Sequence, residues 1–100
     1  MKPEKAIAEK TKDAYSFKCK YYSLREWIRI TRFLLDKGYS PEATEEILYS
    51  KYMRWADDSC GQGIGYRMTL ERFIPYFDKE KKGIDEMLLK EFGSKAVWYL

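Results

Sequence analysis

SPEATEEILYSKYMRWADD, residues 40–58, is the stretch that decides the fold, because it holds the clearest helix start in the chain. Ser40 can accept a backbone N–H as the N-cap, and Pro41 suits the first helical position because it has no N–H to leave unpaired. The apolar residues that follow recur at the spacing of one helix face; they are Ile47, Leu48, Tyr52, Trp55 and Ala56. The stretch predicts an amphipathic helix over 41–57 whose apolar face needs a partner.

The partner helix is predicted immediately upstream, over residues 24–37. Ser23 followed by Glu26 forms a capping box, and Gly38 stands where a residue in the left-handed region would end the helix. The inward positions of this helix are Leu24, Trp27, Ile28, Thr31, Leu34 and Leu35. Because only a tight turn separates the two helices, we expect an antiparallel helix pair that forms most of the core.

The segments before this pair are less regular. Residues 2–14 suit either a short solvated helix or a mobile segment. Residues 15–22 alternate apolar and polar side chains as a short β-strand does, but they also suit an extension of the following helix. Both alternatives stay open for each segment.

Two shorter helices are predicted towards the C-terminus, after a glycine-rich loop. The first covers 70–77, where Pro75 should kink or shorten it, and the second covers 84–92 after a polar turn over 79–83. The residues expected to cap these helices are Thr69 and Gly93. The predicted fold class is therefore mainly α, a small single domain over residues 1–100.

Composition sets limits on the class of protein. With 100 residues, 45% of them hydrophobic, the chain can form one domain with its own core. It contains no apolar leader and no apolar run of membrane-spanning length, so we expect a cytoplasmic protein that does not enter a membrane. Cys19 and Cys60 are isolated in sequence and are expected to be free thiols.

The residue types present argue against catalysis. The chain has no histidine, the commonest general base near neutral pH and the commonest metal ligand, and two distant cysteines cannot build a zinc site. The GQGIG loop, residues 61–65, lacks the third glycine and the preceding strand of a dinucleotide site. We therefore expect no enzyme activity, no cofactor and no metal.

Basic side chains give better candidates for a binding site. Arg25, Arg29 and Arg32 recur at i, i+4 and i+7 on the helix over 24–37, and such a stripe can follow phosphates. The basic residues just upstream are Lys18 and Lys20. The alternative interpretation is a solvated helix face whose arginines pair with neighbouring carboxylates.

A second basic group lies in the opening stretch, where Lys51 and Arg54 adjoin Trp55. In one interpretation, Lys51 and Arg54 extend their charges to solvent beside a buried Trp55. In the other, the three residues form a mixed aromatic and cationic binding site. Both interpretations remain open at this point.

Two segments carry a resemblance to a known group of proteins. GYSPEATEEILYSKYMRWADDS, residues 38–59, and TLERFIPYF, residues 69–77, resemble small helical proteins encoded by bacteriophages, over about residues 23–77. The resemblance implies a viral accessory protein in the cytoplasm of the bacterial host, and it brings no activity with it.

Two functions follow as hypotheses. The first is a non-catalytic binding protein that binds and modulates a host protein or a defence complex, since the chain is rich in tyrosine and in charges of both signs. The alternative is direct binding of DNA or RNA through the basic helix face.

Overall fold

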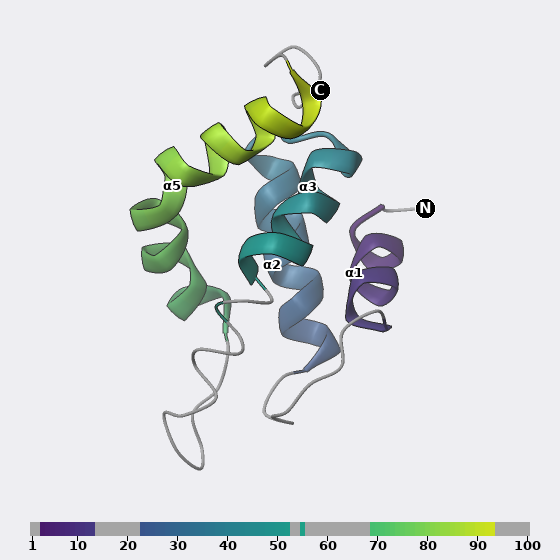
Figure 1. Ribbon diagram of the computed structural model, residues 1–100. Coiled ribbons are helices and arrows are strands. Elements are labelled where there is room, and N and C mark those ends of the chain that lie inside the picture. Colours follow the sequence, from purple (N-terminus) through teal and green to yellow (C-terminus); the bar gives the residue numbers. More distant parts are fainter. Residues whose placement is uncertain (1–2, 14–22, 53–54, 56–68, 94–100) are drawn as a thin grey trace.

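A computed structural model describes residues 3–13, 23–52, 55 and 69–93. In chain order its elements are α1 (Pro3–Asp13), α2 (Leu24–Asp36), α3 (Pro41–Ile47), the π-helical turn η1 (Leu48–Tyr52) and α5 (Leu70–Phe92). Figure 1 shows α1 and α5 on opposite sides of α2, with α3 crossing in front of it. The mainly helical class is therefore confirmed. The predicted alternatives for residues 15–22 lie outside the described residues.

Local hydrogen bonds begin and end α2 where the sequence predicts. The Ser23 hydroxyl oxygen accepts the backbone N–H of Glu26 at 3.2 Å, as an N-cap does. Gly38 has a φ of 98°, in the left-handed region that glycine adopts without strain. The second half of the predicted capping box differs, because the Glu26 carboxylate accepts hydrogen bonds from Arg29 and from the first residue of α5.

The chain turns at Gly38 and runs back across α2 as α3. The Ser40 hydroxyl accepts the backbone N–H of Ala43 at 3.1 Å, with Pro41 at the first helical position, so this predicted cap is also confirmed. The described residues of the predicted helix over 41–57 are all helical, but the helix is not uniformly α: the α-helix α3 ends at Ile47, the π-helical turn covers Leu48–Tyr52, and Trp55 is α-helical again. π-Helical turns bond each N–H five residues back and are wider than an α-helix.

The N-terminal segment forms a packed helix. Ile7, Ala8 and Thr11 of α1 are buried, which places one face of α1 against α2. Lys10 adds a contact to α3 through an ion pair of 3.2 Å with Glu45. Of the two alternatives that the sequence left open here, the structure contains the helix, and this helix contributes to the core.

The two predicted C-terminal helices are one continuous helix, α5, and the predicted turn over 79–83 is helical. Proline inside a helix costs about 3 kcal/mol and glycine about 1 kcal/mol, whereas burying one large apolar side chain contributes about 1.5–3 kcal/mol. The buried residues of α5 are Phe73, Phe77, Ile84 and Leu88. They share one face only when the helix is unbroken, so their combined burial outweighs the cost of Pro75 and Gly83.

Both predicted caps of this region are present. The Thr69 hydroxyl accepts the backbone N–H of Arg72 at 3.4 Å, and Gly93 ends α5 with a φ of 75°. Within the described ranges, no helix combines the length and the apolar composition needed to cross a bilayer.

The core extends beyond the predicted helix pair, because α5 and α1 add buried side chains to it. Phe33 of α2 meets Phe77 edge to face at 5.4 Å between ring centres, and Trp55 meets Phe73 at 5.5 Å. The largest fully buried side chains are Trp27, Ile30, Leu34, Tyr39, Ile47, Leu48, Phe73, Phe77, Ile84 and Leu88. Ile30 was not among the predicted inward positions, and it is buried because α2 is covered on more than one side.

Candidate functional site

The structure describes three of the seven side chains predicted to bind a partner, and all three lie on α2. They are Arg25, Arg29 and Arg32. The side chain of Lys51 is outside the described part of the chain, although its backbone lies in η1. The predicted residues wholly outside it are Lys18, Lys20 and Arg54.

Arg29 lies in a clamp of two carboxylates. Its Nη1 donates to Glu26 Oε1 at 2.7 Å and to Oε2 at 2.9 Å, and its Nη2 donates to Glu71 at the start of α5. Glu26 Oε1 also accepts the backbone N–H of Leu70 at 3.0 Å. The clamp therefore joins the first turn of α2 to the first turn of α5.

The clamp shifts the pKa of Arg29 and the pKa of Glu71, each in the direction that favours the charged form. Hydrogen bonds to Glu71 and then to Glu26 raise the pKa of the Arg29 guanidinium above its ordinary value. The hydrogen bond from Arg29 lowers the pKa of the Glu71 carboxyl. Two negative charges face this one arginine at neutral pH, so Arg29 has less positive field to offer an external phosphate.

The other two arginines of the predicted stripe are exposed. Arg25 lies in the first turn of α2, and Arg32 lies 3.9 Å from Asp36 in an exposed pair. Surface pairs of this kind contribute little energy and leave the cation accessible. The structure therefore has two accessible arginines on α2, separated by one that is already engaged.

A buried tyrosine and a lysine form a second polar cluster, where α5 passes the turn after α2. Lys81 Nζ donates to Tyr39 Oη at 2.6 Å and to Asp85 Oδ1 at 2.8 Å. Burial alone lowers the pKa of Lys81, but the hydrogen bonds to Asp85 and Tyr39 outweigh it and raise the pKa above its ordinary value. Lys81 is thus held as a cation and ties α5 to the turn.

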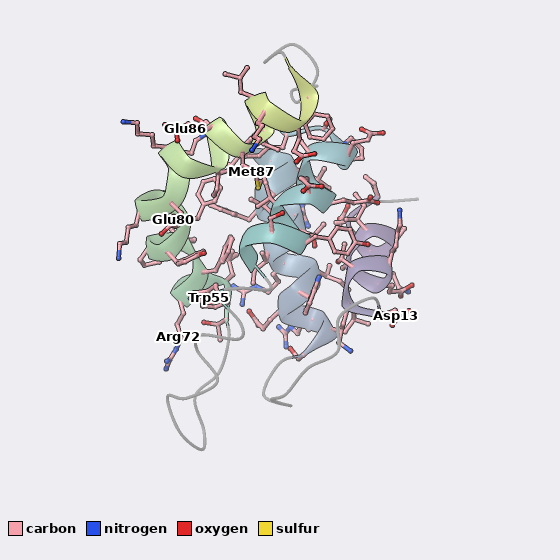
Figure 2. The ribbon with its side chains drawn as sticks, in the orientation of Figure 1. Asp13, Trp55, Arg72, Glu80, Glu86 and Met87 are labelled. Atoms are coloured by element: carbon pink, nitrogen blue, oxygen red, sulfur yellow. The ribbon has the colours of Figure 1, made fainter. Side chains whose placement is uncertain are left out.

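The outer face of α5 carries a row that we call the α5 seam, made of Lys79, Lys82, Glu86 and Leu89. Spacings of three, four and three residues place these side chains on one face, opposite the buried face of the helix. Leu89 is 49% exposed and is the large hydrophobic residue most open to solvent in the described chain. Figure 2 shows Glu86 directed away from the helices, whereas the neighbouring Met87 points toward them.

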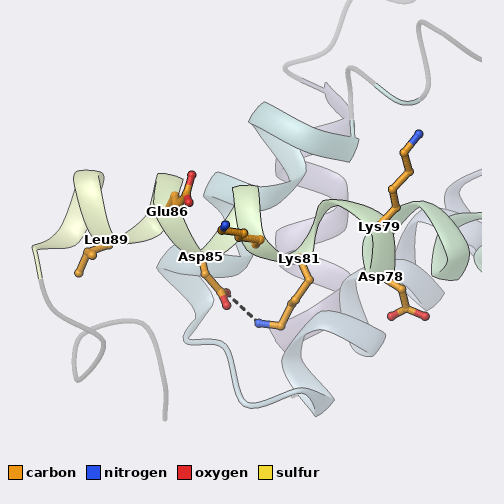
Figure 3. Close-up of a pocket in the computed structure, with 7 residues that line it drawn as sticks. Asp78, Lys79, Lys81, Asp85, Glu86 and Leu89 are labelled. Atoms are coloured by element: carbon orange, nitrogen blue, oxygen red, sulfur yellow. Dashed lines mark hydrogen bonds and ion pairs between the residues drawn. The ribbon is translucent and has the colours of Figure 1, made fainter.

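A shallow depression of about 510 Å³ follows the α5 seam. Its lining residues are Asp78, Lys79, Lys81, Lys82, Asp85, Glu86 and Leu89. Figure 3 shows Lys79 and Glu86 projecting from the same side of α5, with Lys81 and Asp85 joined at another side. The lining therefore offers both signs of charge and one apolar side chain to a ligand.

The charged members of the seam are unpaired within the described chain. No ion pair or hydrogen bond joins Lys79, Lys82 or Glu86 to another residue that the structure describes. Some other charges of the described chain are paired, as in the clamp around Arg29 and in the Lys81–Asp85 pair. The lysines and the glutamate of the seam therefore do not form ion pairs with one another.

Sequence reasoning missed this face. The spacing of Lys79, Lys82, Glu86 and Leu89 was visible in the sequence, but a turn over 79–83 would have divided these residues between two helices. Only a continuous α5 brings them into one row.

Comparisons with models of protein families, with curated proteins and with solved structures found no match to this chain. The site is therefore interpreted from its own geometry.

Proposed function

We propose that this protein is a non-catalytic binding protein that contacts another protein through the outer face of α5. The observation that carries the proposal is the α5 seam, where Leu89 stands exposed beside unpaired lysine and glutamate side chains. In a small protein contact, an exposed leucine can anchor the partner while the charges around it orient that partner.

The charge balance of this face favours a protein over a nucleic acid as the target. Asp78, Asp85 and Glu86 line the depression together with its three lysines, and Lys81 already pairs with Asp85. A phosphate backbone would meet repulsion from the remaining carboxylates. A protein surface can match both signs at once.

The resemblance to bacteriophage-encoded proteins supports a more specific form of the proposal. The partner would then be a protein of the bacterial host, such as a component of a defence complex, and the encounter would take place in the host cytoplasm.

The experiment is a capture assay with matched variants. Immobilised wild-type protein is exposed to bacterial lysate, and each retained protein is purified and titrated by calorimetry against three forms of the chain. These forms are wild type, Leu89→Gln and Lys5→Glu. Lys5 is exposed and belongs to α1, and Figure 1 shows α1 on the opposite side of α2 from α5. We expect wild type and Lys5→Glu to bind alike and Leu89→Gln to bind at least about tenfold more weakly.

Equal binding of the partner by all three forms would contradict the proposal that it binds through the outer face of α5. Circular dichroism melts of the variants show whether each remains folded, so a weakened complex can be separated from an unfolded chain.

Direct nucleic-acid binding remains a second candidate because Arg25 and Arg32 are exposed on α2. If this function holds, affinity for DNA or RNA falls steeply with added salt, and replacing both arginines by glutamine abolishes it. Lys5→Gln and Lys90→Gln together make the control for a loss of two exposed cations. Absence of binding at low salt would exclude this candidate.

A further inference from the structure

We infer that, when no other protein occupies it, the α5 seam of one copy packs against the α5 seam of a second copy, with the two helices antiparallel. The inference rests on the proposed function, because it takes the outer face of α5 as a protein-binding surface and names its occupant in the free protein. The partner protein and the second copy then compete for one surface.

The order of charges along the seam selects a second copy. Lys79 and Lys82 occupy its first half, and Glu86 and Leu89 occupy its second half. A two-fold axis perpendicular to the helices reverses this order, so that Lys82 of each copy meets Glu86 of the other. A parallel pair would place like charges opposite each other at both positions, which is destabilising. The charges of the seam in one copy therefore match those of an antiparallel seam in the second copy.

The apolar member of the seam fits the same arrangement. The register that aligns Lys82 with Glu86 of the second copy also aligns Lys79 with Leu89 of that copy, because both pairs have the same centre at position 84. The aliphatic stem of a lysine can cover a leucine while its ammonium extends to solvent. This contact would cover Leu89, whose side chain is the large hydrophobic one most exposed in the described residues.

The spacing of the seam is also that of a two-helix contact. Residues at 79, 82, 86 and 89 have the three-and-four spacing of the a and d positions of a heptad, although Leu89 is the one apolar residue among them, so this spacing supports the geometry of the contact and not an apolar core. In an antiparallel pair each a position faces a d position, which is the pairing obtained here. Since Lys82 and Glu86 make no ion pair within the described chain, both are available for this contact.

One helix pair of about three turns is a small interface, so the dimer is expected to be weak and to depend on protein concentration. Its ion pairs lie beside the two-fold axis, but a single helix pair leaves them close to solvent, where salt screens them. Added salt should therefore shift the population toward the monomer.

The test is sedimentation velocity over a series from about 1 μM to about 500 μM, a range suited to a weak interface. We expect wild type to pass from monomer to dimer across the series. Lys82→Glu alone and Glu86→Lys alone should each weaken dimerisation about tenfold, because each variant places two like-charged pairs in its own interface. An equimolar mixture of these two variants should recover the wild-type dimer, since both cross pairs again join opposite charges.

A matched mixture isolates the effect of position. Lys5→Glu mixed with Glu86→Lys carries the same total change of charge, but a mixed dimer of these two variants has one opposite-charge pair and one like-charge pair. Dimers then form mainly between Lys5→Glu copies, so this mixture should show less dimer than the complementary one. More dimer in the complementary mixture than in this control requires contact between copies, because no pairing within one chain can depend on mixing.

Three outcomes would overturn the inference. They are a wild-type monomer at every concentration, dimerisation that neither single variant weakens, and equal recovery in both mixtures. The proposed function has a separate readout, the calorimetric titration of a purified partner against Leu89→Gln. A monomeric wild type that still loses its partner on Leu89→Gln rejects the self-association and leaves the proposed function standing.

Discussion

The indole Nε1 of Trp27 donates a hydrogen bond of 2.8 Å to the hydroxyl oxygen of Thr11, and this bond joins the central helix α2 to α1. Both side chains are fully buried. The Thr11 hydroxyl lies 2.8 Å from the Ile7 carbonyl, to which it donates its own proton. The indole N–H of a core tryptophan thus finds its acceptor on a different helix, which ties the first helix of the chain to the second.

Thr11→Val should destabilise the fold by about 1–3 kcal/mol, because it keeps the shape of the side chain and removes the buried hydroxyl oxygen to which the Trp27 indole N–H donates. Urea denaturation followed by tryptophan fluorescence measures this loss. Thr11→Ser keeps the hydroxyl and should lose less stability than Thr11→Val. An equal loss in the two variants would show that packing, and not the hydrogen bond, matters at this position.

Acid should weaken the clamp between α2 and α5. In the folded protein the hydrogen bond from Arg29 lowers the pKa of Glu71 below its ordinary value of 4.5. The unfolded chain then binds more protons than the folded one just below pH 4.5. The contribution of Glu71 to stability is therefore present above that pH and is lost as the pH falls through the folded-state pKa.

Urea midpoints measured from neutral pH to about pH 3 should fall more steeply for wild type than for Glu71→Gln. Glu91→Gln removes an exposed carboxylate from the same helix and is the matched control for the loss of one charge. A wild-type slope in Glu71→Gln would contradict the prediction.

Pro75→Ala should stabilise the protein, by up to about 3 kcal/mol, because proline lies inside the continuous α5 and lacks the N–H that a helix interior uses. Pro75 is exposed, so alanine removes little packing. The gain is measured by urea denaturation together with the helical signal at 222 nm. Lower stability or lower helicity in Pro75→Ala would mean that the region is not one helix in solution.

Gly93→Ala should lower stability by about 1–2 kcal/mol, the cost of holding an alanine in the left-handed conformation. Gly93 has a φ of 75°, and a Cβ added there would meet nothing within 4 Å. The expected loss is therefore one of backbone conformation rather than of space. Thermal melts of the variants measure this loss. Gly93→Asn should lose less stability than Gly93→Ala, because asparagine adopts the left-handed region more readily. Equal stability of glycine, asparagine and alanine at this position would contradict the argument.

The helix caps were predictable because the groups that form each cap are close together in the sequence. Ser23 and Ser40 begin helices by accepting N–H groups three residues ahead, and Gly38 ends one by adopting a positive φ. The amphipathic periods on either side of Gly38 also needed only neighbouring residues. These features do not depend on how the helices later pack.

The predicted basic stripe shows where local reasoning ends. Arg25, Arg29 and Arg32 do lie on one helix, yet the structure engages Arg29 with Glu71, which is 42 residues away in the chain. The spacing of three arginines carries no information about a carboxylate on another helix. The hydrogen bond between Trp27 and Thr11 could not be predicted either, because its two residues belong to different helices.

The sequence by itself determined the helical class, the caps at Ser23, Gly38, Ser40, Thr69 and Gly93, and the apolar faces beside Gly38, because nearest neighbours control caps and periodicity. Only the tertiary structure decided that α5 continues through Pro75 and Gly83, that α1 joins the core and that Arg29 is clamped. Each of these is set by burial or charge pairing between segments far apart in the chain. Such long-range contacts can outweigh a local break of a few kcal/mol.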